Sequence, residues 1–208
     1  MRIGIFGGSF DPIHQGHLIL AENCREQVSL DLVLFIPCAT SPHKTDGAAS
    51  TDRQRCEMIE LAIAGHESFK LSKLEIERGG ISYTSDTLAE LKQQYPDDEL
   101  LLLMGDDSLE SFDRWHEPQK ICELAIPVVA NRPGSGEIDL SVLKKHASAD
   151  RYQQICAATV ESPMIEISST NIRSRSTAAQ STRYLLPRGV ERYIESCLLY
   201  TSPSPRDS

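Results

Sequence analysis

The chain has 208 residues, of which 40% are hydrophobic and 25% charged, and its formal net charge is −9. This composition is typical of a soluble globular protein, and no apolar run approaches the roughly 20 residues needed to span a bilayer. An acidic chain is also a poor candidate for binding nucleic acid, because such binding depends on neutralising phosphates with Lys and Arg. We therefore expect neither a membrane nor a nucleic acid as a partner.

The six cysteines are widely spaced and form no CxxC pair. Such spacing argues against a disulfide framework or a clustered zinc site, and favours reduced, mostly buried thiols. A single Arg precedes the first strand-like segment, so we expect no signal peptide and predict a cytoplasmic protein.

Continuous apolar runs predict strands that are buried on both faces, as in a parallel sheet covered by helices. In chain order they are residues 3–6, 32–36, 100–104 and 126–130, with 164–167 as a weaker run. Residues 69–76 alternate apolar and polar side chains, which is typical of a strand nearer the edge of a sheet.

Helical spacing fills the gaps between these runs. The predicted helices cover residues 18–28, a segment after Thr51, 84–95, 140–146 and 190–198. Thr51 followed by Gln54 is typical of a capping box, and Pro96 should end the helix before it. Strands that alternate with helices predict an α/β fold: an open, mostly parallel, Rossmann-like sheet with helices on both faces. We expect one domain over residues 1–200 and a disordered tail at 201–208, which is polar and contains prolines.

Unusual polar residues follow the ends of five predicted strands. They lie at residues 7–9, 37–44, 105–107, 131–132 and 168–170. The ligand crevice of an open α/β sheet lies outside the carboxyl ends of its strands, so these five segments should converge on one site.

The first of these segments leads into Gly7-Gly8-Ser9-Phe10-Asp11-Pro12-Ile13-His14-Gln15-Gly16-His17. A strand, a glycine turn and a helix start form a phosphate-binding arrangement, because the first helical amides lack internal partners. His14 and His17 should share one face of the first turn, where each can donate to phosphate and a fraction of each is charged. Gly16 would let a ligand approach the backbone.

Two familiar phosphate motifs are missing from the sequence. There is no GxxxxGK[ST], and Gly4, Gly7 and Gly8 do not make GxGxxG. A P-loop NTPase and a redox dinucleotide fold are therefore disfavoured. A metal site at the HxxH spacing is disfavoured too, since no acidic or Cys partner accompanies it locally.

The stretch that contains His14 and His17 resembles the HxGH signature of the nucleotidyltransferase superfamily. Ile167-Ser168-Ser169-Thr170-Asn171-Ile172-Arg173 is similar to that superfamily's second signature, ISSTxIR. Ser41-Pro42-His43-Lys44, Ser82-Tyr83-Thr84-Ser85-Asp86-Thr87-Leu88, Trp115 and Tyr184-Leu185-Leu186-Pro187 narrow the match. Together these motifs resemble the bacterial nicotinate-nucleotide adenylyltransferases from residue 1 to about residue 200.

The resemblance implies the nucleotidylyl transferase fold and one reaction. The phosphate of nicotinate mononucleotide attacks the α-phosphorus of ATP, pyrophosphate leaves, and nicotinate adenine dinucleotide forms. The family uses Mg²⁺ and no covalent intermediate, so catalysis would rest on positioning and electrostatic stabilisation.

The resemblance also implies roles for individual residues. The catalytic residues would be His14, His17 and Arg173. The ATP site would comprise Gly7, Gly8, Ser9, Phe10, His14, His17, Ser169, Thr170 and Arg173. The nicotinate mononucleotide site would comprise Lys44, Tyr83, Thr84, Asp106, Trp115 and Arg132. No protein metal ligand is implied.

Ile81 stands where this family often has a proline before Ser-Tyr-Thr, and the tail after Tyr200 lies beyond the family pattern. Two alternative functions stay open. One is a related HxGH transferase with another phosphate acceptor, such as phosphopantetheine, and the other is a non-catalytic nucleotide-binding regulator. The oligomeric state is not readable from the sequence.

Overall fold

The computed structural model describes residues 1–40, 48–131 and 138–201. Its centre is a six-stranded parallel sheet in the order β3-β2-β1-β4-β5-β6. The strands are β1 (Arg2–Gly8), β2 (Leu32–Pro37), β3 (Phe69–Leu71), β4 (Glu99–Gly105), β5 (Ile126–Asn131) and β6 (Val160–Glu161). This order confirms the predicted open, Rossmann-like α/β fold.

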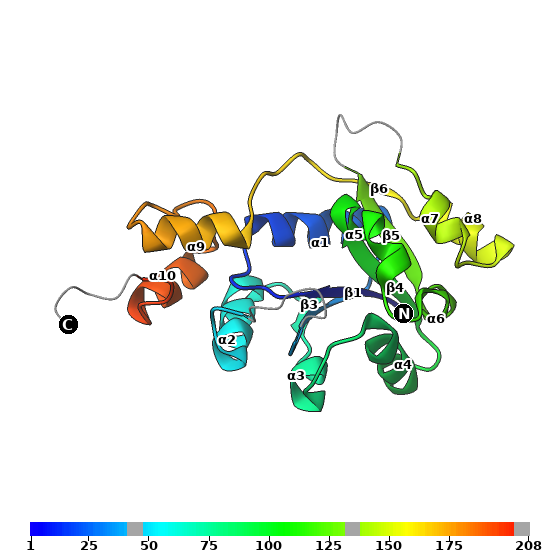
Figure 1. Ribbon diagram of the computed structural model, residues 1–208, viewed down its shortest axis with the longest axis horizontal. Helices are drawn as coiled ribbons and strands as arrows, with labels where there is room; N and C mark the ends of the chain where they lie inside the picture. The colour runs from blue at the N-terminus through cyan, green and yellow to red at the C-terminus, as the bar shows by residue number, and fades with distance from the viewer. Residues whose placement is uncertain (41–47, 132–137, 202–208) are drawn as a thin grey trace.

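Helices cover the sheet on both faces, with α1 on one side and α4 on the other (Figure 1). In the described ranges they are α1 (Gln15–Gln27), α2 (Asp52–Ile63), α3 (Leu74–Arg78), α4 (Thr84–Gln94), α5 (Asp106–Glu110), α6 (Pro118–Leu124), α7 (Ser141–Lys144), α8 (Ala149–Ala157), α9 (Ser169–Thr177) and α10 (Arg188–Ser196). A 3-10 turn, η1 (Phe112–Arg114), follows α5. None of the helices in these ranges has the length and apolar character that crossing a membrane requires.

The four long apolar runs became the four central strands because both of their faces are covered. All six residues of β2 are buried, as are the five central residues of β4. The same residues form one continuous hydrophobic core that includes Phe35, Leu101 and Val128, all of them inaccessible to solvent. The predicted strand cores at 3–6, 32–36, 100–104 and 126–130 are therefore confirmed.

Local signals also placed several helices correctly. Thr51 caps α2, where its Oγ1 accepts a hydrogen bond from the Gln54 backbone N–H at 3.3 Å, and the Gln54 side chain accepts one from the Thr51 N–H at 2.9 Å. The helix at 84–95 ends at Gln94, close before Pro96. The helices predicted from the sequence do not include α3, α5, α6 and α8, which are short helices of five, five, seven and nine residues.

Two strand predictions were wrong in part or whole. Residues 69–76 form an edge strand only as far as Leu71, and the later residues enter α3. Residues 164–167 form no strand. The ladder ends just before them, because Ser162 donates its N–H to the Asn131 carbonyl at 2.8 Å and the next residue, Pro163, has no N–H to donate.

The expectation of mostly buried cysteines held for three of the six, namely Cys24, Cys56 and Cys122. Burial raises the pKa of the Cys24 thiol to about 12, so this thiol stays protonated. Cys38 is half-buried, and Cys156 and Cys197 are exposed.

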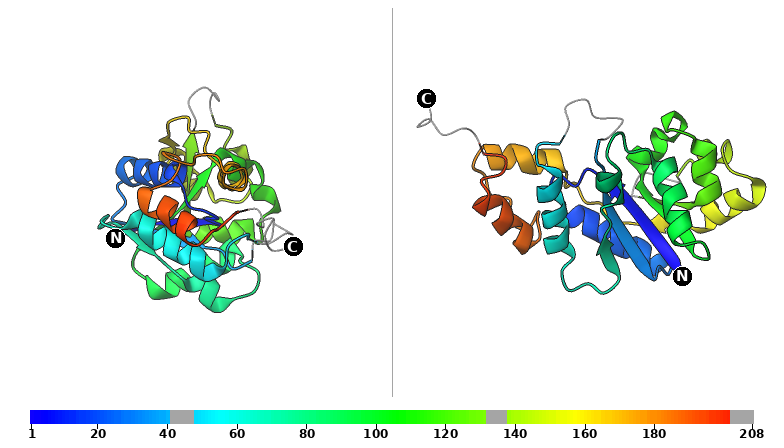
Figure 2. Two further views of the ribbon diagram at one scale, coloured as in Figure 1. Left: turned by 90° about the vertical axis from the view of Figure 1, so that its left-hand side faces the viewer. Right: turned by 90° about the horizontal axis from the view of Figure 1, so that it is seen from below.

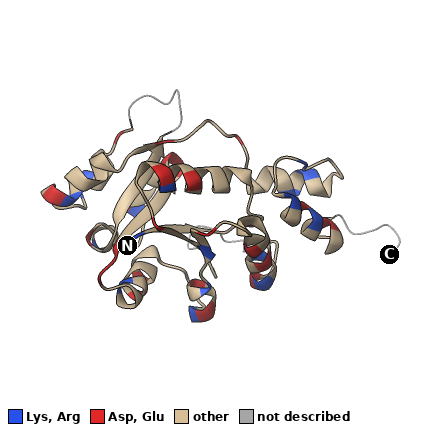
Figure 3. Cartoon of the chain, turned by 180° about the vertical axis from the view of Figure 1, so that it is seen from behind, with Lys and Arg blue, Asp and Glu red and all other residues tan. Residues whose placement is uncertain are grey.

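Two further views place the C-terminal helices relative to the sheet (Figure 2). Helices α9 and α10 lie beyond one end of the strands, beside α2, and α10 packs against α2. Acidic and basic residues are mixed along outer helices such as α2 (Figure 3). Because the net charge is −9, a site for an anionic ligand needs its own local donors.

Candidate active site

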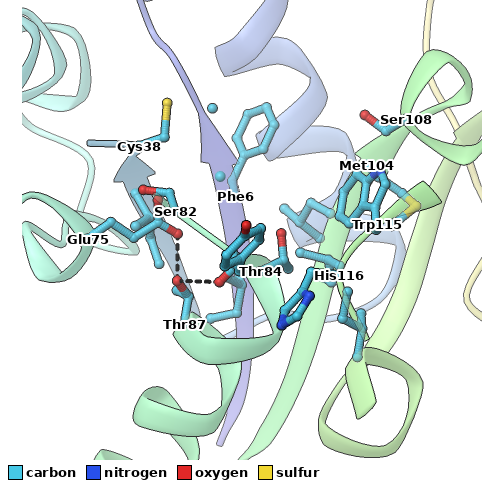
Figure 4. A pocket seen from close by; sticks show the side chains of 18 of the residues that line it. Phe6, Cys38, Glu75, Ser82, Thr84, Thr87, Met104, Ser108, Trp115 and His116 are labelled. Atoms are coloured by element: carbon cyan, nitrogen blue, oxygen red, sulfur yellow. Dashed lines mark hydrogen bonds between the residues drawn. The ribbon is translucent and has the colours of Figure 1, made fainter. Parts of the chain in front are cut away.

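A cavity of about 560 Å³ opens where the strand order reverses, between the carboxyl ends of β1 and β4 (Figure 4). Its volume lies within the usual range for small-molecule sites, and the switch point of a parallel sheet is where such sites occur. Its walls come from the end of β1, the start of α4 and the segment that follows β4.

Gly7, Gly8 and Ser9 line the cavity at the end of β1, as predicted. Phe10 turns away from it: its ring is 1% exposed and packs edge-on against Phe6, with ring centroids 5.5 Å apart. A Cβ on Gly8 would lie 3.2 Å from the Phe10 ring, closer than ordinary van der Waals contact. A glycine at position 8 therefore allows the turn to fold over the aromatic ring.

His14 and His17 stand at the start of α1, as the N-cap and the third helical residue. Their rings stack with centroids 3.7 Å apart. The His14 backbone N–H donates to Nδ1 of His17 at 3.2 Å. Because Nδ1 accepts this bond, the hydrogen of a neutral His17 ring resides on Nε2, which makes Nε2 a donor. The predicted shared face of the two histidines is present.

His14 is less accessible than the sequence suggested, with an exposed fraction of 5%. Burial lowers its pKa to about 4, so the expectation that a fraction of this ring is charged at neutral pH was wrong. Within the described part of the chain, His14 Nδ1 has no hydrogen-bond partner. A Cβ on Gly16 would lie only 3.1 Å from that atom, so Gly16 makes room for the His14 ring.

Helix α9 brings the second signature to the same turn. Arg173 Nη1 donates to the Asp11 carbonyl at 2.8 Å, and the Ser169 hydroxyl donates to the Pro12 carbonyl at 2.9 Å. Thr170 is exposed beside them, and its hydroxyl oxygen lies 3.4 Å from Arg173 Nη2. The structure therefore joins the two signatures that the sequence separates by about 160 residues.

Tyr83, Thr84 and Trp115, which the resemblance assigns to the mononucleotide site, line the other side of the cavity. The Trp115 indole is oriented by its Nε1–H, which donates to the Ser111 hydroxyl at 3.2 Å. Thr84 is the first residue of α4, so the free amides of that helix start lie at the cavity wall. Aromatic rings and a helix start thus face one space.

The remaining predicted mononucleotide contacts are Asp106, Lys44 and Arg132. Asp106 begins α5 directly after Gly105, but it does not line the cavity. Lys44 and Arg132 lie outside the described residues, so their predicted roles stay predictions.

The chain matches the cytidylyltransferase-like family over residues 5–175. It is 43% identical to a protein from Thermomicrobium roseum described as a probable nicotinate-nucleotide adenylyltransferase, across 96% of this chain and 91% of that protein. A protein of the same description from Salinibacter ruber is 40% identical across 96% and 98% of the two chains. The chain belongs to the nicotinate-nucleotide adenylyltransferase family.

A solved structure, the Plasmodium falciparum nicotinic acid mononucleotide adenylyltransferase complexed with NaAD, has the same fold. The two structures superpose with a TM-score of 0.75 at 21% identity, covering 96% of this chain and 97% of the other. The predicted family and fold are both confirmed.

The cavity is also lined by residues that were not predicted from the sequence, among them Glu75, Arg114 and His116. The His116 ring lies against the Tyr83 ring, with centroids 4.3 Å apart. Both Arg114 and His116 adjoin Trp115 in the sequence, so the aromatic residue that indicated the pocket could also have indicated these two neighbours.

Glu75 is a buried carboxyl in the cavity wall, with an exposed fraction of 7%. It accepts a hydrogen bond from the Thr87 hydroxyl at 2.6 Å (Figure 4). Burial raises the pKa of this carboxyl, which reduces the negative charge that it would present to an anionic ligand.

Proposed function

We propose that the chain transfers the adenylyl group of ATP to nicotinate mononucleotide, which yields nicotinate adenine dinucleotide and pyrophosphate. The observation that carries this proposal is one cavity at the β1–β4 switch point with the glycine turn on one side and the Tyr83, Thr84 and Trp115 wall on the other. The relatives at about 40% identity bear the name of this activity.

The ATP phosphates would lie along the glycine turn. Donors there include backbone amides of the turn and Nε2–H of His17. Arg173 adds a cation to the same place, because it is held against the Asp11 carbonyl. Such donors stabilise the charge that develops on the reacting phosphoryl group and on the leaving pyrophosphate.

His14 would act through a neutral ring. A pKa of about 4 means that the ring carries no charge near pH 7 before ATP arrives. Nearby phosphate charge would raise that pKa, and the unpartnered Nδ1 could then be paired by a ligand oxygen or a water. Neither histidine needs to act as a nucleophile, because the attacking atom is a phosphate oxygen of the second substrate.

The pyridine ring of the mononucleotide would lie beside Trp115, with its carboxylate at the start of α4. Amides at a helix start and the helix dipole both favour an anion. Thr84 lines the cavity at this place, and the raised pKa of Glu75 weakens the opposing charge. This geometry favours the acid, nicotinate, over the neutral nicotinamide. Phosphopantetheine, the alternative acceptor, would need no aromatic wall of this kind, so the wall disfavours that alternative.

We propose that Mg²⁺ enters with ATP. Among the described residues, no group of three or more His, Cys, Asp or Glu side chains is arranged to hold a metal ion by itself. Mg²⁺ is commonly held by substrate phosphates, water and one or two carboxylates, so the site fits an ion that arrives on the triphosphate. When bound, the ion would neutralise phosphate charge.

The test is pyrophosphate release from ATP and Mg²⁺ with nicotinate mononucleotide and nicotinamide mononucleotide in parallel. We expect rapid release with the nicotinate form and much slower release with the nicotinamide form. The absence of release with either substrate, in a preparation that binds ATP, would instead support the alternative of a nucleotide-binding regulator. Equal rates would refute the carboxylate site at the start of α4.

A further inference from the structure

The side chain of Arg55 on α2 is fully buried, with an exposed fraction of 0% for the residue. Arginine is almost never buried to this degree unless its charge is paired and its donors are used. Arg53, two residues earlier on the same helix, has a side chain that is 87% exposed. The burial of Arg55 is therefore specific to its position, which faces the ends of β1 and β2.

The guanidinium of Arg55 donates to two backbone carbonyls at the base of the active-site turn. Nη1 lies 2.8 Å from the Ser9 carbonyl oxygen, and Nη2 lies 2.6 Å from that of Cys38. Nη2 also donates to the Asp52 carboxylate at 2.6 Å. One side chain thus fixes the peptides that follow two neighbouring strands.

Fixing a carbonyl also fixes the N–H of the same peptide, because a trans peptide is planar and its C=O and N–H point in opposite directions. The Cys38 carbonyl faces Arg55, and the Ala39 N–H of that peptide donates to the Ser82 hydroxyl at 3.0 Å. By the same geometry, the Phe10 N–H points away from Arg55. Phe10 has a φ of +47°, a conformation that a bulky residue keeps only when its surroundings hold it.

The positive charge of Arg55 lies next to this turn, on the side of the Ser9 carbonyl. Asp52, the carboxylate that Arg55 bonds, has a side chain that is 51% exposed, so water screens that partner while the guanidinium is desolvated. A desolvated charge is felt over a longer distance than a solvated one. Arg55 therefore contributes positive potential at the turn in a chain whose net charge is −9.

We propose that Arg55 is a positioning residue for the triphosphate: it holds the Ser9–Phe10 peptide so that the Phe10 N–H faces the phosphates, and places a buried positive charge behind it. Arg55 itself does not touch the substrate. This inference rests on the proposed function only in taking ATP as the ligand of the turn.

The experiment measures the dissociation constants of ATP and of adenosine by calorimetry for the wild type, Arg55→Met, Arg55→Lys and Arg53→Met. Adenosine lacks phosphates, so its affinity reports the nucleoside site alone. Both Arg55 variants lose hydrogen bonds from the charged guanidinium to the carbonyls of the turn. We therefore expect them to bind ATP at least about tenfold more weakly, while adenosine affinity stays within about twofold. Arg53→Met, the matched exposed arginine, should behave as the wild type.

Asp52→Asn serves as a further variant, since it alters a half-exposed side chain and leaves both carbonyl contacts of Arg55 in place. Removing this counter-charge should keep the affinity for ATP equal to that of the wild type or raise it, and a lower affinity would overturn the electrostatic part of the proposal. An unchanged ATP affinity in folded Arg55→Lys would overturn the positioning role. A parallel loss of ATP and adenosine binding would assign Arg55 a purely structural role. If the wild type itself failed to bind ATP, the proposed function would fail instead.

Discussion

Gly16 provides a sharp test of how the His14 ring is held. In Gly16→Ala the new Cβ would lie 3.1 Å from Nδ1 and 3.2 Å from Cε1 of His14. Ordinary contacts between such atoms are about 3.5 Å or longer, so the ring must move by about 0.4 Å. A displacement of about 1 Å in a catalytic group can cost about a hundredfold in rate. If the logarithm of the rate falls in proportion to the displacement, 0.4 Å corresponds to about sixfold.

Stability should respond differently from rate in this variant. Replacing a helical glycine by alanine stabilises a helix by up to about 1 kcal/mol, and the steric displacement of His14 offsets a similar amount. We therefore expect kcat for pyrophosphate release to fall about sixfold while Tm changes by no more than a few degrees.

Gly189→Ala is the matched control, because Gly189 is also the second residue of a helix. Its Cβ would meet the Cβ of Leu61 at 3.5 Å, an ordinary contact, so this variant should keep the wild-type kcat. A wild-type kcat in Gly16→Ala would refute the idea that the proposed role of the His14 ring depends on the space above Gly16.

Three more predictions concern His17, His14 and Trp115. His17→Ala should lower kcat by about 10²–10³ in the pyrophosphate assay, the usual cost of removing one transition-state donor, and a loss below tenfold would contradict the donor role of Nε2. His14 has a folded pKa of about 4 against 6.5 when unfolded, so its unfolded form binds a proton first as pH falls. The stability that this ring contributes is complete above pH 6.5 and declines toward pH 4. Urea unfolding should therefore show the wild type losing about 2–3 kcal/mol more than His14→Gln between pH 7.5 and 4.5, and equal losses would mean that the ring is accessible. Trp115→Ala should raise KM for nicotinate mononucleotide by about tenfold, as expected for a lost aromatic contact, and leave KM for ATP unchanged. A change in both KM values would indicate that the indole supports the whole cavity.

Much of the sheet could be predicted because burial on both faces leaves a direct trace in the sequence. The six residues of β2 are apolar and all buried, which is typical of a strand covered by helices on both faces. The same reasoning failed at residues 164–167, where Met164 is 61% exposed. Short apolar runs carry no information on whether a neighbouring strand is available, and here Pro163 had already ended the ladder.

The candidate site was predictable in outline because parallel strands place their carboxyl ends along one edge. That rule brought residues 7–9, Cys38 and Gly105 into one cavity, whereas Tyr83 and Thr84 were identified through the family resemblance. It could not find Arg55, since a charged residue in a helix is usually solvated. One signal was present: position 55 lies three and four residues before Met58 and Ile59, on the buried face of α2. The protonation state of His14 depends on burial by distant segments and was not accessible to sequence reasoning.

The way in which the glycine–histidine turn is held has a consequence for how the protein is made. Its carbonyls are bonded by Ser169 and Arg173, which follow their partners in the chain by 157 and 162 residues. The Gln15 N–H also donates to the Leu185 carbonyl at 3.0 Å. A ribosome that adds about 5–20 residues per second therefore needs on the order of ten seconds or more between making the motif and making its supports. During that interval the nascent chain carries the whole HxGH sequence without a formed triphosphate site, so the onset of tight ATP binding would mark the arrival of α9 and residue 185 rather than the synthesis of the motif.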